Sequence, residues 1–145
     1  MAGGPVRSLD GLSGQVIPAL EGSATQAYKV GDLVQFETAG RIIVATAGSI
    51  SGIATTKAKG TADTVTSVEL LSPDKVYIAY YKASAITQAL IGDCLDFVFD
   101  VGAHYLDESS ATTDVYCVGL YDPVGTVGGR LLVRFYGTLF TASAT

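Results

Sequence analysis

The chain has 145 residues, the size of one compact domain or of two small lobes that share a core. Only 16% of the residues are charged, compared with about 25% in a typical domain, and the net charge is −5. Neither half carries the basic stripe that would neutralise phosphates, so we expect no direct nucleic-acid binding. The shortage of charge indicates either a large β core or a neutral surface that a partner covers.

The first segment, residues 1–14, is rich in Gly and Ser and cannot build a core of its own. It carries the apolar residues Val6, Leu9 and Leu12 and the basic residue Arg7. We interpret it as an extended N-terminal arm, which either stays floppy or becomes ordered on a partner. The same segment lacks the basic and apolar regions of a signal peptide, and no apolar stretch in the chain is long enough to span a membrane, so we expect no membrane partner.

From residue 15 onward the pattern is strand, turn, strand, which predicts a single all-β domain over 15–145. Val, Ile, Tyr, Phe and Thr are frequent in the predicted strands, and clusters of Gly, Asp, Pro or Ser separate them. Residues 83–91 form either one or two helical turns or a loop. The strands are expected at 15–19, 27–38, 41–46, 50–56, 64–71, 75–82, 92–100, 114–121 and 129–140.

Two of these runs alternate cleanly, as a strand with one apolar face does in an antiparallel sheet over a core. The residues on the two apolar faces are Leu95, Phe97 and Phe99 in one run and Leu131, Val133 and Phe135 in the other. This alternation predicts that both runs lie over the core.

An approximate internal repeat is the most informative feature of the sequence. The segment VGDLVQF at 30–36 recurs as IGDCLDF at 91–97, within longer repeats that span 24–57 and 86–124. A Gly-Asp pair before an alternating strand is a turn by which the chain enters a sheet sharply. Two such units predict two β lobes, or a barrel with rough internal symmetry.

Residues that carry chemistry are sparse. His104 is the only histidine, and no carboxylate or thiol stands at a spacing that suggests a catalytic group, so we interpret it as a polar edge residue. Cys94 and Cys117 lack the spacing of a zinc site and are either two buried thiols or a disulfide.

A metal site is not expected either. In a strand Asp93 projects to the face opposite Asp96 and Asp100, so these three carboxylates do not converge. The glycine-rich stretches 48–52 and 125–129 lack the central Ser of a nucleophile elbow and the Lys of a phosphate loop. We therefore predict a protein that is not an enzyme and uses no cofactor.

Four stretches of the sequence resemble the small capsid decoration proteins of tailed phages, also called cement or head-stabilising proteins. The stretches are Tyr28–Val34, Ala45–Ala54, the second Gly-Asp at 92–93 and the closing strand Gly129–Phe135. The resemblance implies a β-barrel or β-tulip-like fold, often trimeric, on the outside of the capsid over junctions between capsomers. It also implies an N-terminal arm that reaches onto neighbouring capsid protein, whereas the loop around 107–113 departs from the family.

On this basis we expect a structural virion protein, made in the host cytoplasm, that sits on the outer capsid surface as a homotrimer. It would bind the major capsid protein and stabilise the assembled shell by mass action. The residues expected to bind the partner are Val6, Arg7, Leu9 and Leu12 of the arm. Two alternatives are a phage tail-tube or other virion structural subunit, and a carbohydrate- or receptor-binding β module.

Overall fold

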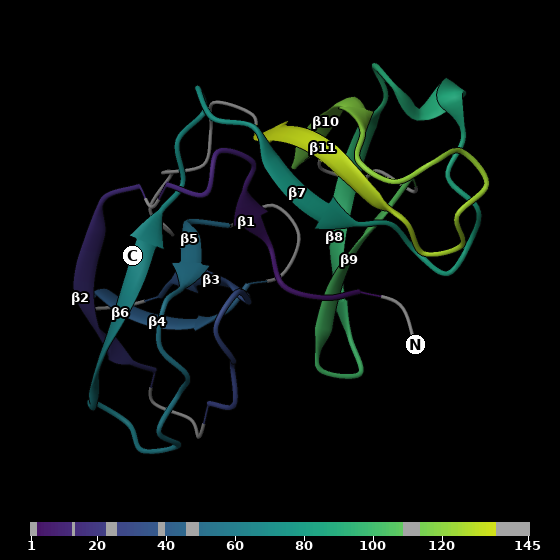
Figure 1. Ribbon diagram of the computed structural model, residues 1–145. Coiled ribbons are helices and arrows are strands. Elements are labelled where there is room, and N and C mark those ends of the chain that lie inside the picture. The colour runs from purple at the N-terminus through teal and green to yellow at the C-terminus, as the bar shows by residue number, and fades with distance from the viewer. Residues whose placement is uncertain are drawn as a thin grey trace.

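The chain folds into two β lobes that lie side by side, and the residues described include no α-helix (Figure 1). One lobe is a closed five-stranded barrel and the other is a six-stranded sheet. The all-β prediction is therefore confirmed. The structure is a computed structural model and describes residues 3–12, 14–22, 26–37, 40–45, 50–108 and 114–135.

The barrel occupies the first half of the chain. Its strands follow the order β2-β4-β3-β5-β6, and β2 closes the ring by pairing with β4 in parallel and with β6 antiparallel. Tyr28, Val34, Ile42 and Val68 fill its interior, each at most 1% exposed. The strands are β2 (Val16–Glu21), β3 (Leu33–Phe36), β4 (Arg41–Val44), β5 (Gly52–Ala54) and β6 (Val65–Leu70).

The six-stranded sheet follows the order β1-β7-β11-β10-β8-β9. Leu131, Val133 and Phe135 of the last strand are buried, as their alternation predicts, but Phe99 is 37% exposed near the end of its strand. The strands are β1 (Arg7–Ser8), β7 (Tyr77–Tyr80), β8 (Cys94–Asp100), β9 (Ala103–Asp107), β10 (Val115–Leu120) and β11 (Arg130–Phe135), with a 3-10 turn at Gln88–Leu90.

The two lobes repeat the same connectivity. In the first lobe β3 pairs with both β4 and β5, and in the second β8 pairs with both β9 and β10. The turns that enter the two central strands are built alike, because Gly31 and Gly92 have φ angles of 92° and 93°. Gly31 N–H donates to the Ala54 carbonyl at 2.9 Å and Gly92 N–H to the Cys117 carbonyl at 2.7 Å. The prediction of two repeated halves is confirmed at the level of hydrogen bonds.

The correspondence extends beyond the repeated sequence to all five strands. β2 pairs with β6 as β7 pairs with β11, and β5 pairs with β6 as β10 pairs with β11. The parallel pair Glu21–Ile42 that closes the barrel has a counterpart in the isolated parallel bridge between Tyr81 and Leu106. The second lobe is therefore a copy of the barrel plan, with β1 added at the outer edge of β7.

One continuous hydrophobic core joins the lobes. Leu33, Ala45 and Ile53 of the first lobe belong to the same buried cluster as Phe97 and Phe135 of the second. The rings of Phe97 and Phe135 stack with their centroids 5.8 Å apart. Apolar side chains of the two lobes are therefore buried against one another, which stabilises both lobes.

The N-terminal segment differs from the free arm that the sequence predicts. Within residues 3–12, Gly4 N–H donates to the His104 carbonyl at 3.1 Å, Val6 N–H to Gly31 at 2.9 Å and Leu9 N–H to Val76 at 2.9 Å. Residues 3–12 therefore lie on both lobes. Its bonding partners all lie far away in the sequence, so no local pattern indicates these contacts.

Most strands begin or end at other residues than predicted, and two differences are larger. The strand expected at 27–38 is confined to β3, because residues 29–32 form a turn in which Asp32 N–H donates to the Lys29 carbonyl at 3.0 Å. β9 was not predicted, since its sequence AHYLD gives a weak strand pattern. The part of the chain that the structure describes contains no helix long and apolar enough to cross a bilayer.

Candidate partner-binding site

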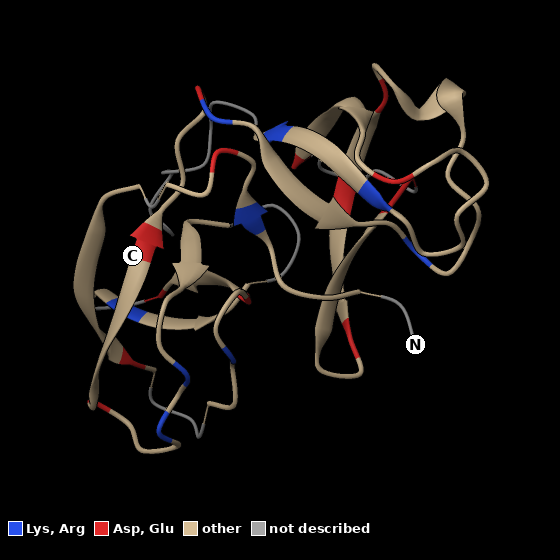
Figure 2. Cartoon of the chain, in the orientation of Figure 1, with Lys and Arg blue, Asp and Glu red and all other residues tan. Residues whose placement is uncertain are grey.

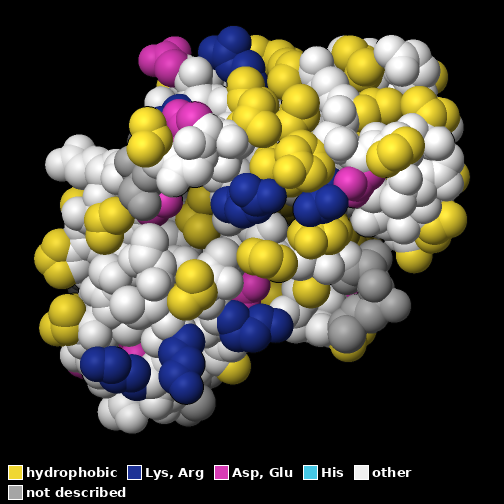
Figure 3. All heavy atoms as spheres, viewed as in Figure 1, with side chains coloured by type: hydrophobic (Ala, Val, Ile, Leu, Met, Phe, Trp, Pro, Cys, Tyr) yellow, Lys and Arg dark blue, Asp and Glu magenta, His cyan; other side chains and the backbone are white. Residues whose placement is uncertain are grey.

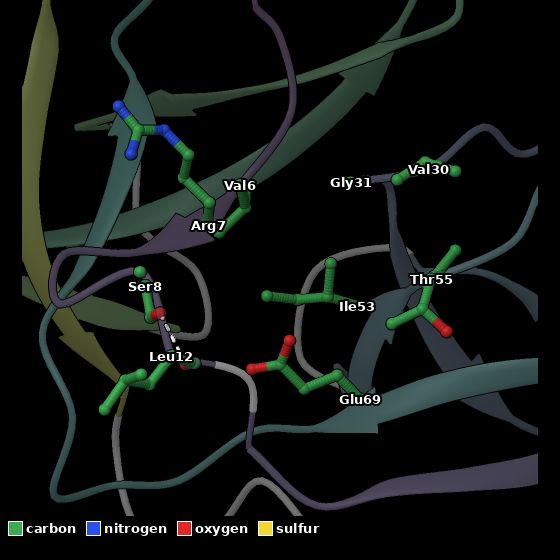
Figure 4. Close-up of a pocket in the computed structure, with 11 residues that line it drawn as sticks. Val6, Arg7, Ser8, Leu12, Val30, Gly31, Ile53, Thr55 and Glu69 are labelled. Atoms are coloured by element: carbon green, nitrogen blue, oxygen red, sulfur yellow. Dashed lines mark hydrogen bonds between the residues drawn. The ribbon is translucent and has the colours of Figure 1, made fainter.

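A hollow of about 430 Å³ opens between the N-terminal segment and the barrel (Figure 4). We call it the N-terminal hollow. Its walls come from β1 and the loop that follows, from the turn before β3, and from β5 and β6. The residues on which the argument depends are Val6, Leu12, Val30, Ile53, Thr55 and Glu69.

Gly31 permits the close approach that forms the upper wall of this hollow. Its φ of 92° is a conformation that glycine adopts without steric cost. A Cβ atom at this position would lie 2.4 Å from the Cβ of Pro5, so any larger residue would push the N-terminal segment away. The contact places Val6, which is 2% exposed, against the core between the lobes.

The loop after β1 holds Leu12 in an exposed position. Ser8 Oγ and Lys75 Nζ donate to the Leu12 carbonyl at 2.8 and 2.9 Å, and Leu12 N–H donates to Asp10 Oδ1 at 2.9 Å. The last bond favours the ionised carboxylate and, with Ser8, holds the pKa of Asp10 below its usual value. The Leu12 side chain is nevertheless 67% exposed. Hydrogen bonds fix its backbone, while its apolar side chain faces solvent.

Glu69 points into the N-terminal hollow from β6 (Figure 4). The residue is only 8% exposed, and its Oε2 accepts a hydrogen bond from Gly14 N–H at 2.9 Å. Among the residues described, no Lys or Arg lies within 4.0 Å of this carboxylate. The hollow therefore contains a largely buried carboxylate with no cationic partner.

The Arg7 side chain leaves the hollow and turns toward β11, as the close-up shows (Figure 4). Its guanidinium lies 5.9 Å from the centroid of the Tyr121 ring, and Arg130 lies over the same ring at 4.6 Å. Arg130 also donates two side-chain bonds to Asp122, at 2.9 and 2.8 Å, which lowers the pKa of that carboxyl. Figure 2 shows a basic position on β1 and one at each end of β11, with β7 between the two strands.

The four residues predicted to bind a partner have different environments. Val6 is 2% exposed and packs in the core of its own chain, whereas Leu9 is 44% and Leu12 67% exposed. The Arg7 side chain is exposed but engaged with Tyr121. Side chains of several kinds mix on the face seen in Figure 3, where apolar groups lie beside cationic ones.

No sequence pattern indicates the remaining walls of the hollow. Glu69 stands in the strand sequence VTSVEL, where an isolated Glu is most simply interpreted as a solvated residue. Val30 and Ile53 lie in predicted strands, where apolar residues fit any β core. The pairing of Ile53 with Glu69 and the bond from Gly31 N–H to the Ala54 carbonyl bring these residues together in the barrel, and the N-terminal segment forms the opposite wall of the hollow.

His104 is a buried residue at the junction of the lobes rather than the polar edge residue that was predicted. It is 1% exposed, its Nε2–H donates to the Ala45 carbonyl at 3.0 Å, and its Nδ1 accepts from Leu33 N–H at 3.4 Å. Burial disfavours the charged ring and lowers the pKa of His104. From β9 of the second lobe, the histidine thus bonds to β3 of the barrel and to the residue that follows β4.

The two cysteines form no disulfide with each other, and the prediction that both are buried is wrong for Cys94, which is exposed. Cys94 pairs with Tyr116, the neighbour of Cys117, so the two thiols point to opposite faces of adjacent strands. Burial raises the pKa of the Cys117 thiol. Among the residues described, no three His, Cys, Asp or Glu side chains lie close enough to hold a metal ion.

Comparison with protein-family models, with curated proteins and with solved structures finds no match to this chain. Its sequence and geometry are therefore the basis of the functional argument.

Proposed function

We propose that the chain is a structural virion protein that binds the outside of an assembled phage capsid and stabilises the shell without catalysing a reaction. The observation that carries this proposal is the exposed apolar edge formed by the side chains of Leu9 and Leu12. They lie beside the N-terminal hollow on a segment whose backbone is fixed by hydrogen bonds. Exposed leucines on an ordered backbone lose little conformational entropy when a partner covers them. In this proposal the partner is the major capsid protein, and the chain acts as a homotrimer.

Binding to the assembled lattice stabilises it by mass action, in proportion to occupancy and affinity. Several copies that engage the same shell convert modest individual contacts into strong overall attachment. The two barrel-like lobes share one core, so each chain is a compact body that transmits load between neighbouring capsid subunits.

The test is co-sedimentation of the purified chain with expanded capsids that lack it. Changing Leu9 and Leu12 together to Ser is expected to weaken binding about tenfold or more, since fully burying a leucine side chain contributes about 1.5–3 kcal/mol. A matched control changes Val124 and Val127 to Ser, because these residues are 61% and 69% exposed on the loop between β10 and β11. Equal binding of both variants and the unmodified chain would overturn the assignment of this edge.

Imaging of purified particles tests the broader proposal. Protrusions of this chain at fixed positions on the capsid surface would support it, and absence of the chain from virions would refute it. Rings or tubes formed by the purified chain would instead favour the tail-tube alternative. The carbohydrate alternative has less support, because the residues that line the N-terminal hollow and a second hollow beside β2 and β6 include no aromatic ring, whereas sugar sites are commonly built on one.

A further inference from the structure

We propose that the N-terminal hollow binds a lysine or arginine side chain of the partner protein, with Glu69 as its counter-charge. The inference rests on the proposed function, because it names the chemistry of the partner at the same site. In this proposal Glu69 recognises a partner, in addition to accepting its hydrogen bond from Gly14 N–H within the fold.

The two buried glutamates of the barrel differ in their hydrogen bonds. Glu21, which is fully buried, accepts bonds on both oxygens, from Lys59 N–H at 2.8 Å and from Gly60 N–H at 3.1 Å. Glu69 is buried almost as deeply but has a bond to Gly14 N–H on one oxygen. A buried carboxylate is stable only when it is paired or well hydrogen-bonded. Glu69 is therefore the glutamate that a cation from outside would complete.

The nearby cations of the same chain are engaged elsewhere. Arg7 lines the hollow, but its guanidinium lies beside Tyr121, and Lys75 Nζ donates to the Leu12 carbonyl. Neither lies within 4.0 Å of the Glu69 carboxylate. The side of Glu69 that faces the hollow thus remains open to a cation of a partner.

The walls of the hollow fit the stem of such a side chain. Ile53 lies beside the carboxylate, and Val30 and Leu12 line the hollow farther from it (Figure 4). Lysine and arginine carry an apolar stem and a charged tip, and they bury the stem along apolar surface when the tip finds a partner. The volume of about 430 Å³ lies in the range of sites that bind small ligands.

An NMR titration of the isolated, isotope-labelled chain tests the proposal without a capsid. The probe is Nα-acetyl-lysine methylamide, and its neutral counterpart is Nα-acetyl-norleucine methylamide, which has a similar apolar stem and no charge. The lysine probe is expected to shift the amide signals of residues 6–12, 30–31, 53–55 and 69 at millimolar concentration. The norleucine probe is expected to bind at least tenfold more weakly.

Two variants separate a charge-pairing site from a merely apolar hollow. Glu69→Gln keeps an acceptor for Gly14 N–H but removes the charge, and it should weaken binding of the lysine probe about tenfold. Asp74→Asn is the control, because that carboxylate is 93% exposed and lies outside the hollow. If Glu69→Gln fails to fold, the salt dependence of the unmodified chain decides, because only the charged probe should lose affinity as NaCl is raised.

Equal affinity for the two probes, or no localised shifts with either, would overturn the assignment of Glu69. Those outcomes leave capsid binding untouched, since co-sedimentation measures it separately. Conversely, if the chain binds the lysine probe but is absent from virions, the proposed function is refuted and the assignment of Glu69 as a cation-binding residue is retained.

Discussion

At the scale of single residues, Val101 adopts a backbone conformation that β-branched residues rarely take. It is the first residue of the two-residue turn between β8 and β9, and both Val101 and Gly102 have positive φ angles, 49° and 76°. Hairpin turns of this kind favour Asn at the first position, because a β-branched side chain crowds the backbone there. The Val101 side chain is 73% exposed, so packing does not offset this strain.

Replacing Val101 by Asn is therefore expected to stabilise the chain by about 1 kcal/mol, through relief of the left-handed conformation. Urea denaturation measures the change in the free energy of unfolding. Val124→Asn is the matched control, since Val124 is 61% exposed and is not among the residues with positive φ. A gain of equal size in both variants would show that the backbone conformation is not its cause.

His104 makes the stability of the chain depend on pH. Its pKa is lowered from the ordinary value of 6.5 because the ring is buried, although Asp32 and the bond to Ala45 oppose the shift. Below pH 6.5 the unfolded chain binds a proton that the folded chain does not, until the pH falls to the lower pKa of the folded state. Stability is thus full above pH 6.5 and decreases as the pH falls through this window.

The variant His104→Gln tests this dependence, because Gln can donate to Ala45 and accept from Leu33 without titrating. Between pH 7 and pH 5 the free energy of unfolding of the unmodified chain should fall more steeply than that of the variant. His104 is the only histidine, so no other imidazole contributes to the difference. Parallel curves for the two proteins would contradict the assignment.

At the scale of elements, what the sequence predicts depends on how local the signal is. The repeated Gly-Asp turns were visible because each lies directly before its strand, and the faces of β11 followed from simple alternation. β1 has only two residues and forms by pairing with the edge of β7. No local sequence pattern therefore predicts it. The N-terminal hollow was missed for the same reason, since its walls meet only when that segment is in place.

The corresponding strands β7 and β2 differ in whether a further strand pairs with their outer edge. In the second lobe Ile78 of β7 pairs with Arg7 of β1. Pro18 holds the corresponding position in β2, where proline has no N–H to donate to an added strand. Proline is characteristic of edge strands that avoid further pairing. Pro18 thus explains why β2 receives no added strand in this structure, whereas β7 pairs with β1.

At the scale of the whole molecule, the N-terminal segment connects the two lobes. Its backbone bonds reach the Gly31 turn of the first lobe, and β7 and the His104 carbonyl of the second. Val6 inserts into the core cluster that the lobes share. A segment that looks like a detachable arm in the sequence therefore contributes to the stability of the folded body.

Deleting residues 1–8 is accordingly expected to destabilise the chain by about 2–4 kcal/mol, because it uncovers the Val6 site and the edge of β7. Guanidinium denaturation measures the loss, and Val6→Ala should show a smaller part of it, since that variant keeps the backbone bonds of the segment. A truncated chain as stable as the complete one would mean that the segment contributes little to the fold and behaves as the free arm first predicted. Because truncation affects both folding and binding, the Leu9 and Leu12 substitutions are the cleaner test of partner binding.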